Sequence, residues 1–89
     1  MNIKRERTWV CYILRCADDT LYCGITNDLE KRFAAHNEGT AAKYTRARGP
    51  VALVLVEHCA DRSTALKREM SIKGLTRADK LALIQSSLK

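Results

Sequence analysis

The sequence predicts a small α+β domain with the element order strand, strand, helix, short helix, strand, helix, helix. Three observations predict it. Three short runs of apolar, β-branched and aromatic residues are typical of strands. Three amphipathic stretches that follow capping residues are typical of helices. The length of 89 residues and the apolar fraction of 46% suit one compact core and exclude a wholly disordered chain.

The first two strands are predicted over residues 8–16 and 21–26. The first run, TWVCYILRC, is apolar on both faces, which is typical of a central strand. The four residues between the runs, Ala-Asp-Asp-Thr, favour a turn. A hairpin is therefore the economical connection between the two strands.

The first helix is predicted to begin at Asn27 and to end near Asn37. Asn27 is a favourable N-cap, and Glu30 follows three residues later in the register of a capping box. Asp28 suits the positive end of the helix dipole. Gly39 is the expected stop signal.

The second half of the chain predicts a short helical turn, a third strand and two helices. Their ranges are 40–50 for the stretch that holds the turn, 51–59 for the strand, 62–73 for the next helix and 76–88 for the last. We expect a flexible basic leader over residues 1–8 and a single domain over residues 9–89.

The charge of the chain favours a polyanionic partner. Sixteen Lys and Arg against ten Asp and Glu give a formal net charge of +6, which suits nucleic acid. The longest apolar stretch, over residues 51–56, is far shorter than the roughly 20 residues that span a bilayer, so we expect no membrane segment. The N-terminus shows no small-residue cleavage site, and we expect a cytoplasmic protein.

The four cysteines raise the possibility of zinc or redox chemistry. No two of them form a CxxC pair, and no CxxH motif is present. Three lie in apolar runs, where a free cysteine behaves as a small buried hydrophobe. We therefore expect reduced cysteines that pack in the core: Cys11, Cys16, Cys23 and Cys59.

Two polar residues are predicted beside the apolar stripe of the first helix. Leu29 and Phe33 mark the side of this helix that faces the interior. Arg32 and His36 fall within the same arc of about 100°, and so they should not project on the solvent side. Each alone is compatible with a snorkelling or boundary residue. Together, one turn apart, they indicate a site.

A carboxylate lies on the apolar side of the next helix. Glu69 points into the middle of the predicted buried arc, with Lys73 beside it. A surface pair of Glu69 with Lys73 is worth only about 0.2–0.5 kcal/mol, too little to explain a carboxylate on an apolar face. The apolar residues that mark this arc are Ala65, Leu66, Met70 and Ile72.

Two tyrosines of the predicted hairpin fall on one face of the sheet if the strands pair suitably. Tyr12 lies in the first strand and Tyr22 in the second. Gly24, on the same face as Tyr22, would leave room for a closely approaching backbone or ligand. Taken singly, each phenol is more typical of packing than of chemistry.

Phosphodiester hydrolysis is the chemistry that suits these residues. A carboxylate can anchor a divalent cation, which stabilises developing charge on a phosphate oxygen. A guanidinium offers bidentate hydrogen bonds to phosphate. A phenol or an imidazole takes the proton from the attacking water.

At this point the sequence resembles the GIY-YIG nuclease superfamily, specifically its small stand-alone bacterial members of the YhbQ type. The matching segments are VCYILRC, LYCGIT, NDLEKRFAAHN and DRSTALKREMSIKG, and the resemblance covers roughly residues 9–84. It implies a three-stranded antiparallel sheet flanked by helices. The namesake tripeptides are Val-Cys-Tyr and Tyr-Cys-Gly here, and no asparagine follows Asn37 to match the late Asn of many members.

The resemblance implies hydrolysis of DNA with one divalent ion, Mg²⁺ or Mn²⁺, held by Glu69. It implies that Tyr12 is the general base, that Tyr22 and Arg32 orient water and phosphate, and that His36 assists proton transfer or polarises Tyr12. Gly24 corresponds to the last residue of the second motif. Lys73 is the available polar substitute for the missing Asn, and a separate protein partner would supply targeting.

Three functions remain open from the sequence. The first is a structure-selective or weakly specific DNA endonuclease of repair or recombination. The second is a non-catalytic nucleic-acid-binding module, whose binding would weaken with salt and need no metal. The third is a thiol redox or zinc protein. Candidate DNA contacts, which could equally form a solvated surface, are Lys31, Lys43, Tyr44, Arg46 and Arg48, with Tyr44 available for stacking.

Overall fold

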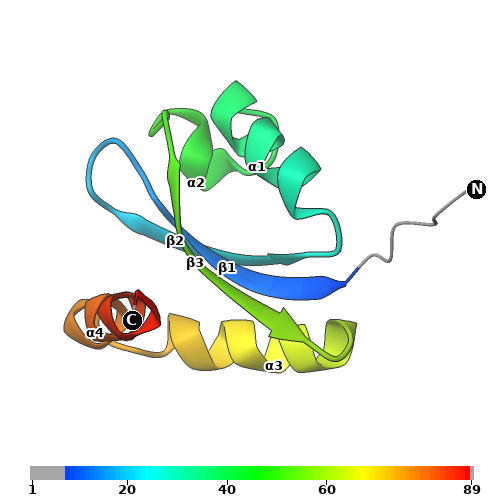
Figure 1. Cartoon of the computed structure of the whole chain (residues 1–89). Coiled ribbons are helices and arrows are strands. Elements are labelled where there is room, and N and C mark those ends of the chain that lie inside the picture. The colour runs from blue at the N-terminus through cyan, green and yellow to red at the C-terminus, as the bar shows by residue number, and fades with distance from the viewer. Residues whose placement is uncertain (1–7, 89) are drawn as a thin grey trace, which may run out of the picture.

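The computed structural model describes residues 8–88, in which three antiparallel strands form one sheet (Figure 1). The strands are β1 (Trp9–Arg15), β2 (Leu21–Thr26) and β3 (Ala52–Cys59), in the order β2-β1-β3. The predicted central strand is confirmed, since β1 pairs on both sides. The leader predicted over residues 1–8 lies outside the described residues, apart from Thr8.

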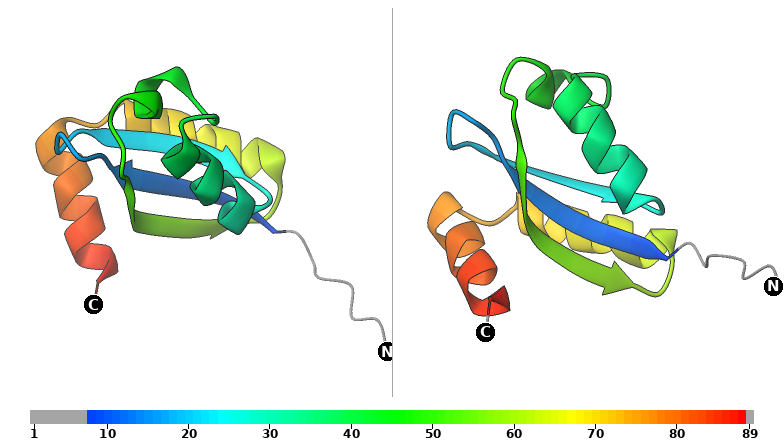
Figure 2. Two further views of the ribbon diagram at one scale, coloured as in Figure 1. Left: turned by 90° about the horizontal axis from the view of Figure 1, so that it is seen from above. Right: turned by 45° about the horizontal axis from the view of Figure 1, so that its top comes forward.

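Helices cover both faces of the sheet (Figures 1 and 2). One face carries α1 (Leu29–Glu38) and the short α2 (Lys43–Arg46). The other face carries α3 (Arg62–Lys73) and α4 (Arg77–Ser87). The predicted α+β class and element order are therefore confirmed. Within residues 8–88, no helix combines the length and apolar character needed to cross a bilayer.

The start of α1 lies one residue later than predicted. The N-cap is Asp28, whose carboxylate accepts a hydrogen bond from the Lys31 backbone N–H at 3.3 Å. Asp28 is held in place because its own N–H donates to the hydroxyl of Thr26, the last residue of β2, at 3.0 Å. The prediction of Asn27 as N-cap is wrong, and Glu30 lies at the second helical position instead of in capping-box register.

The other predicted helix boundaries agree with the structure. Gly39 ends α1 in the left-handed conformation with φ of 80°, and its N–H bonds to the last carbonyls of the helix. The Asp61 carboxylate accepts from Thr64 N–H at 2.8 Å, and the Thr76 hydroxyl accepts from Asp79 N–H at 3.1 Å. These caps start α3 and α4 where the sequence predicts them.

Two apolar clusters lie on opposite faces of the sheet. The cluster toward α3 and α4 contains Cys11, Ile13, Cys23, Leu55, Ile72 and Ile84. The cluster toward α1 contains Val10, Tyr12, Leu14, Cys16 and Val51. Three cysteines are buried, Cys59 is partly buried and all four are free, which confirms their expected role in packing.

Met70 is a correction to the predicted buried arc of α3. Its residue surface is 71% exposed, whereas Ala65 and Ile72 are fully buried. At 100° per residue, Met70 lies about 160° around the helix from Ile72, so both residues cannot face the sheet. The side of α3 that covers the sheet is thus centred on Ala65 and Ile72.

Candidate functional site

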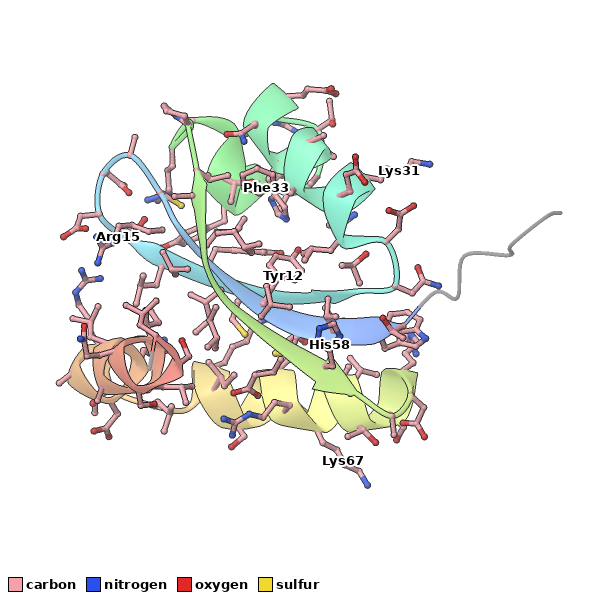
Figure 3. All side chains as sticks on the ribbon, in the orientation of Figure 1. Tyr12, Arg15, Lys31, Phe33, His58 and Lys67 are labelled. Carbon is pink, nitrogen blue, oxygen red and sulfur yellow. The ribbon has the colours of Figure 1, made fainter. Side chains whose placement is uncertain are left out.

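A buried hydrogen bond joins the first strand to the first helix. The Tyr12 hydroxyl on β1 lies 2.8 Å from His36 Nε2 on α1, and Tyr12 is only 1% exposed. Figure 3 shows Tyr12 rising from the sheet toward α1, on the same side as Phe33. The prediction that His36 faces the interior is confirmed, since the residue is fully buried.

The second ring nitrogen of His36 is held by a residue of α2. His36 Nδ1 lies 2.9 Å from the hydroxyl of Thr45, which is also fully buried. The Thr45 hydroxyl also lies 3.3 Å from the Ala42 carbonyl, to which it can donate its single hydrogen; we infer that it accepts a hydrogen bond from Nδ1–H. Nε2 is then the free acceptor for the Tyr12 O–H. The chain runs in one direction, from Tyr12 through His36 and Thr45 to the backbone.

The electrostatics of the pair favour two neutral partners. Burial raises the pKa of Tyr12 to about 12, while interaction with the Arg32 side chain lowers it. Burial, with a smaller contribution from the Arg32 charge, lowers the pKa of His36 below its ordinary value of 6.5. At neutral pH the imidazole is therefore an unprotonated acceptor for the phenol.

The space over Gly24 is occupied by Tyr12. A β-carbon at Gly24 would lie 2.7 Å from the Tyr12 hydroxyl oxygen and 2.8 Å from Cζ. The two residues are direct partners across β1 and β2, which places the phenol over the glycine. The sequence suggested room for a backbone or ligand at Gly24. The structure fills that room with the candidate general base.

Tyr22 lies beside this chain and connects it to α2. Its ring centroid is 5.0 Å from that of His36 and 6.5 Å from that of Tyr12, so both hairpin tyrosines lie on one face, as predicted. The Tyr44 ring lies 5.7 Å from Tyr22. The Arg48 guanidinium sits over the same Tyr44 ring at 4.3 Å from its centroid. Tyr44 thus has two ring contacts and is still 40% exposed, so its availability for base stacking stays a prediction.

Arg32 reaches the surface instead of remaining inside. The residue is exposed, contrary to the expectation that it would avoid the solvent side, because a long side chain can extend past apolar neighbours. It lines two adjoining cavities of about 270 and 250 Å³ near the start of α1. One of them also includes Lys31, and the other includes Trp9 and Arg62. Arg32 therefore links the buried phenol to a basic surface.

Glu69 and Lys73 lie on the opposite side of the sheet. The Glu69 side chain is 17% exposed, and its carboxylate lies 3.5 Å from Lys73 Nζ. Both residues belong to α3, whereas His36 belongs to α1 and Tyr12 packs on the face of the sheet that α1 covers. Within residues 8–88, no hydrogen bond or ion pair joins Glu69 to Tyr12, Arg32 or His36. The structure brings the predicted site together in two parts, with β2 at the edge between them.

A family model described as the GIY-YIG catalytic domain matches residues 8–82, which include every one of these side chains. The chain belongs to the GIY-YIG family. This match confirms the resemblance carried by the sequence motifs and covers both parts of the candidate site.

Relatives of the GIY-YIG chain agree in sequence and in fold. This chain is 57% identical over 75 residues to a UPF0213 protein of Clostridium perfringens, and the match covers 84% of this chain and 81% of that one. A solution NMR structure of a UPF0213 protein from Bacillus halodurans is 39% identical, with a TM-score of 0.58, and covers 92% of this chain and 85% of that one. A second NMR structure, of a protein from E. faecalis, is 36% identical and has a TM-score of 0.60. The match covers 100% of this chain and 94% of that one.

Glu69 is the single carboxylate that the sequence predicts as a metal ligand in this GIY-YIG chain. In residues 8–88, no three His, Cys, Asp or Glu side chains gather closely enough to hold an ion. Mg²⁺ commonly takes one or two protein carboxylates and completes its octahedron with water and substrate phosphate. Glu69 meets that minimum, because its side chain is mostly buried yet reaches the surface beside Lys73.

The predicted DNA-contact residues divide into two groups. Lys31, Lys43 and Arg46 are exposed, and Figure 3 shows Lys31 extending away from α1. Arg48 is occupied: it pairs with Asp18 at 2.9 Å and donates to the Tyr44 carbonyl at 2.9 Å. Arg48 therefore ties the hairpin turn to α2, in addition to any contact with DNA.

Sequence reasoning missed three residues near the site. Thr45 gives no signal, because nothing in its spacing from His36 shows that α2 packs over α1. Arg77 and Lys80 line cavities beside Tyr44. Their spacing of three residues on a predicted helix places them on one face, and that signal was present in the sequence.

Proposed function

We propose that this GIY-YIG protein is a metal-dependent endonuclease that hydrolyses DNA phosphodiester bonds, with selectivity for DNA structure and a role in repair or recombination. Residues 9–89 would form its single nuclease domain. The observation that carries the proposal is the directed chain from Tyr12 through His36 to Thr45, in a chain that belongs to a nuclease family. The basic charge of +6 supports a nucleic-acid substrate.

The proton would move along the hydrogen-bond chain. A water oxygen attacks phosphorus and gives its proton to Tyr12, as the phenol proton passes to His36 Nε2. The P–O bond to the leaving strand breaks, that oxygen takes up a proton from solvent water, and His36 releases its proton to solvent. A neutral His36 suits this role because its lowered pKa leaves Nε2 unprotonated at neutral pH. Arg32, at the surface near Tyr12, would bind the phosphate.

Glu69 would hold the divalent ion, Mg²⁺ or Mn²⁺. When bound, the ion would polarise a phosphate oxygen and stabilise the charge that develops on it. Lys73, 3.5 Å from the Glu69 carboxylate, would give up this ion pair and become available to a phosphate. DNA that follows the edge of β2 would contact both parts of the site.

A non-catalytic nucleic-acid-binding module is the second candidate, and two observations favour it. Tyr12 is 1% exposed, which restricts access of water to the phenol. Glu69 belongs to α3, which covers the opposite face of the sheet from α1, where His36 and Tyr12 lie. This module would bind DNA without metal and would cut nothing.

A cleavage panel separates the two candidates. Labelled duplex, single strand, flap and four-way junction would be incubated with Mg²⁺ or Mn²⁺ and wild type, Glu69→Gln or Glu38→Gln. Glu38 is an exposed carboxylate on α1 and serves as the matched control. We expect cutting by wild type and Glu38→Gln only. DNA binding without cutting by a folded wild type, as checked by circular dichroism, would favour the binding module.

A further inference from the structure

We propose that the edge of β2 carries a groove for a single strand of DNA, bound through Lys73, Arg77 and Lys80. None of these cations was among the DNA contacts expected from sequence. The groove runs along the outer edge of β2, between the cations of α3 and α4 and the tyrosines on the α1 side of the sheet. The proposal that substrate follows this groove rests on the nuclease function proposed for the adjoining pair of Tyr12 and His36, which we call the Tyr12–His36 centre.

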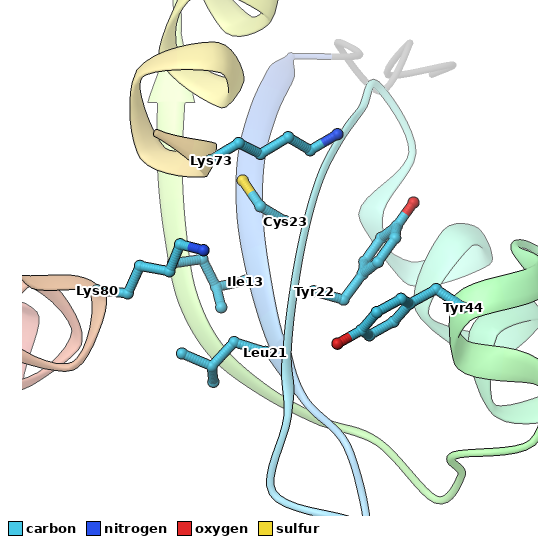
Figure 4. A pocket seen from close by; sticks show the side chains of 7 residues that line it. All are labelled: Ile13, Leu21, Tyr22, Cys23, Tyr44, Lys73 and Lys80. Atoms are coloured by element: carbon cyan, nitrogen blue, oxygen red, sulfur yellow. The ribbon is translucent and has the colours of Figure 1, made fainter. Parts of the chain in front are cut away.

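Two adjoining cavities define the groove. The first, of about 230 Å³, is lined by Ile13, Leu21, Tyr22, Cys23, Tyr44, Lys73 and Lys80 (Figure 4). The second, of about 200 Å³, is lined by Thr20, Leu21, Tyr44, Arg77 and Lys80. They share three residues and so continue into one another along β2. In Figure 4 the two lysines approach β2 from α3 and α4, opposite the two tyrosines.

The charge of the groove suits phosphate. Its lining has three cations and no carboxylate. Lys73 pairs with Glu69 at 3.5 Å and Arg77 with Asp19 at 3.3 Å, but these cations are about half exposed, and such pairs contribute little. Within residues 8–88, the structure records no ion pair for Lys80. Its charge is the one most available to a phosphate.

The apolar part of the lining favours a single strand over a duplex. Leu21, Tyr22 and Tyr44 form a partly exposed apolar floor beside the lysines, whereas Ile13 and Cys23 are buried. Bases of a duplex are stacked inside the helix and would leave this floor uncovered. An unpaired nucleotide can place its base and sugar on the floor while its phosphates meet the lysines.

Tyr22 connects the groove to the proposed centre. Its ring lines the larger cavity and lies 5.0 Å from the His36 ring. A strand in the groove would therefore pass from the α4 side of β2 toward Tyr12 and His36. The groove would bind the unpaired arm of a substrate whose scissile phosphate lies near this centre.

Binding measured in EDTA tests the groove without requiring catalysis. The probe is a short labelled single-stranded oligonucleotide, with a blunt duplex of the same sequence for comparison, and affinity is followed by anisotropy over a range of salt. The test variant is the double substitution Arg77→Gln with Lys80→Gln. The control is Lys67→Gln, a cation that extends away from α3 on the side remote from the sheet (Figure 3).

We expect weaker single-strand binding by the double variant, with the slope of log affinity against log salt reduced by about 1.4, or roughly 0.7 for each lost contact. In Lys67→Gln, the slope of log affinity against log salt should fall by less than in the double variant. If the double variant binds the single strand with the same affinity and salt slope as Lys67→Gln, the groove is overturned. If the double variant loses as much affinity for the duplex as for the single strand, the single-strand assignment is overturned. A wild type that binds through this groove but cuts no substrate would overturn the proposed nuclease function alone.

Discussion

Thr45 shows how one hydroxyl can set the chemistry of a distant phenol. We infer that its hydrogen goes to the Ala42 carbonyl, which leaves its oxygen as an acceptor for His36. The imidazole must then carry its proton on Nδ1 and leave Nε2 to Tyr12. Thr45 touches no reacting atom and acts as a positioning residue.

Replacing Thr45 with valine should leave His36 Nδ1–H buried without an acceptor. We expect a loss of about 1–3 kcal/mol in the free energy of unfolding, measured by urea denaturation. ¹⁵N NMR of the imidazole should show loss of the single Nδ1–H tautomer. Thr45→Ser, which retains the hydroxyl, should restore that tautomer. A valine variant with the wild-type tautomer would contradict the assigned direction of the chain.

The lowered pKa of His36 predicts acid sensitivity with a definite sign. Below about pH 6.5 the unfolded chain binds a proton at this histidine, while the folded chain resists it because the ring is buried. The free energy of unfolding should therefore fall as the pH drops from 7 through 6.5. His36→Gln should flatten this dependence, and His58→Gln, a substitution of an exposed histidine, is the control variant. An unaltered slope in His36→Gln would contradict the prediction.

At the scale of elements, the hairpin positions the phenol. The pairing of β1 with β2 sets Tyr12 opposite Gly24, and the phenol lies within the volume of a side chain at that position. The same pairing puts Tyr22 on the same face, two residues along. The hairpin motif is therefore a packing requirement of the phenol as well as a sequence signature.

Gly24→Ala should displace Tyr12 from His36. A new methyl group 2.7 Å from the phenol oxygen forces the buried ring to move, at a cost typical of overpacking, about 1–3 kcal/mol. Thermal or urea unfolding measures the loss. Gly74→Ala is the matched control, because a β-carbon there meets only ordinary contacts at 3.6 Å and φ is −77°. Equal stabilities of the two variants would be incompatible with the close contact.

Much of this element-scale organisation could be predicted from the sequence. The apolar runs predict the strands, and the helix caps predict the ends of the helices, because both signals act over a few residues. These caps are Gly39, Asp61 and Thr76. The α1 cap was misplaced because Asn27 and Asp28 are both favourable N-caps, and only the Thr26 contact decides between them. The role of Thr45 depends on how α2 packs against α1, which no local pattern encodes.

At the scale of the whole molecule, the candidate site surrounds an edge strand. The Tyr12–His36–Thr45 chain joins β1 to α1 and α2 on one face of the sheet, while Glu69 and Lys73 belong to α3 on the other face. The burial of His36 and the mostly buried position of Glu69 were predictable, but the exposure of Arg32 and the separation of the two groups were not. Periodicity shows which side of a helix faces the sheet, and it does not show which face of the sheet that helix covers.

Single-turnover cleavage by Tyr12→Phe tests the central claim most directly. The substitution removes only the hydroxyl that donates to His36, and circular dichroism would verify that the variant folds. With saturating Mg²⁺ and the preferred DNA substrate, we predict a rate lower by about 10²–10⁴ than wild type, the range of a lost general acid–base group. Cleavage by Tyr12→Phe at the wild-type rate would contradict the assignment of the buried phenol as the base.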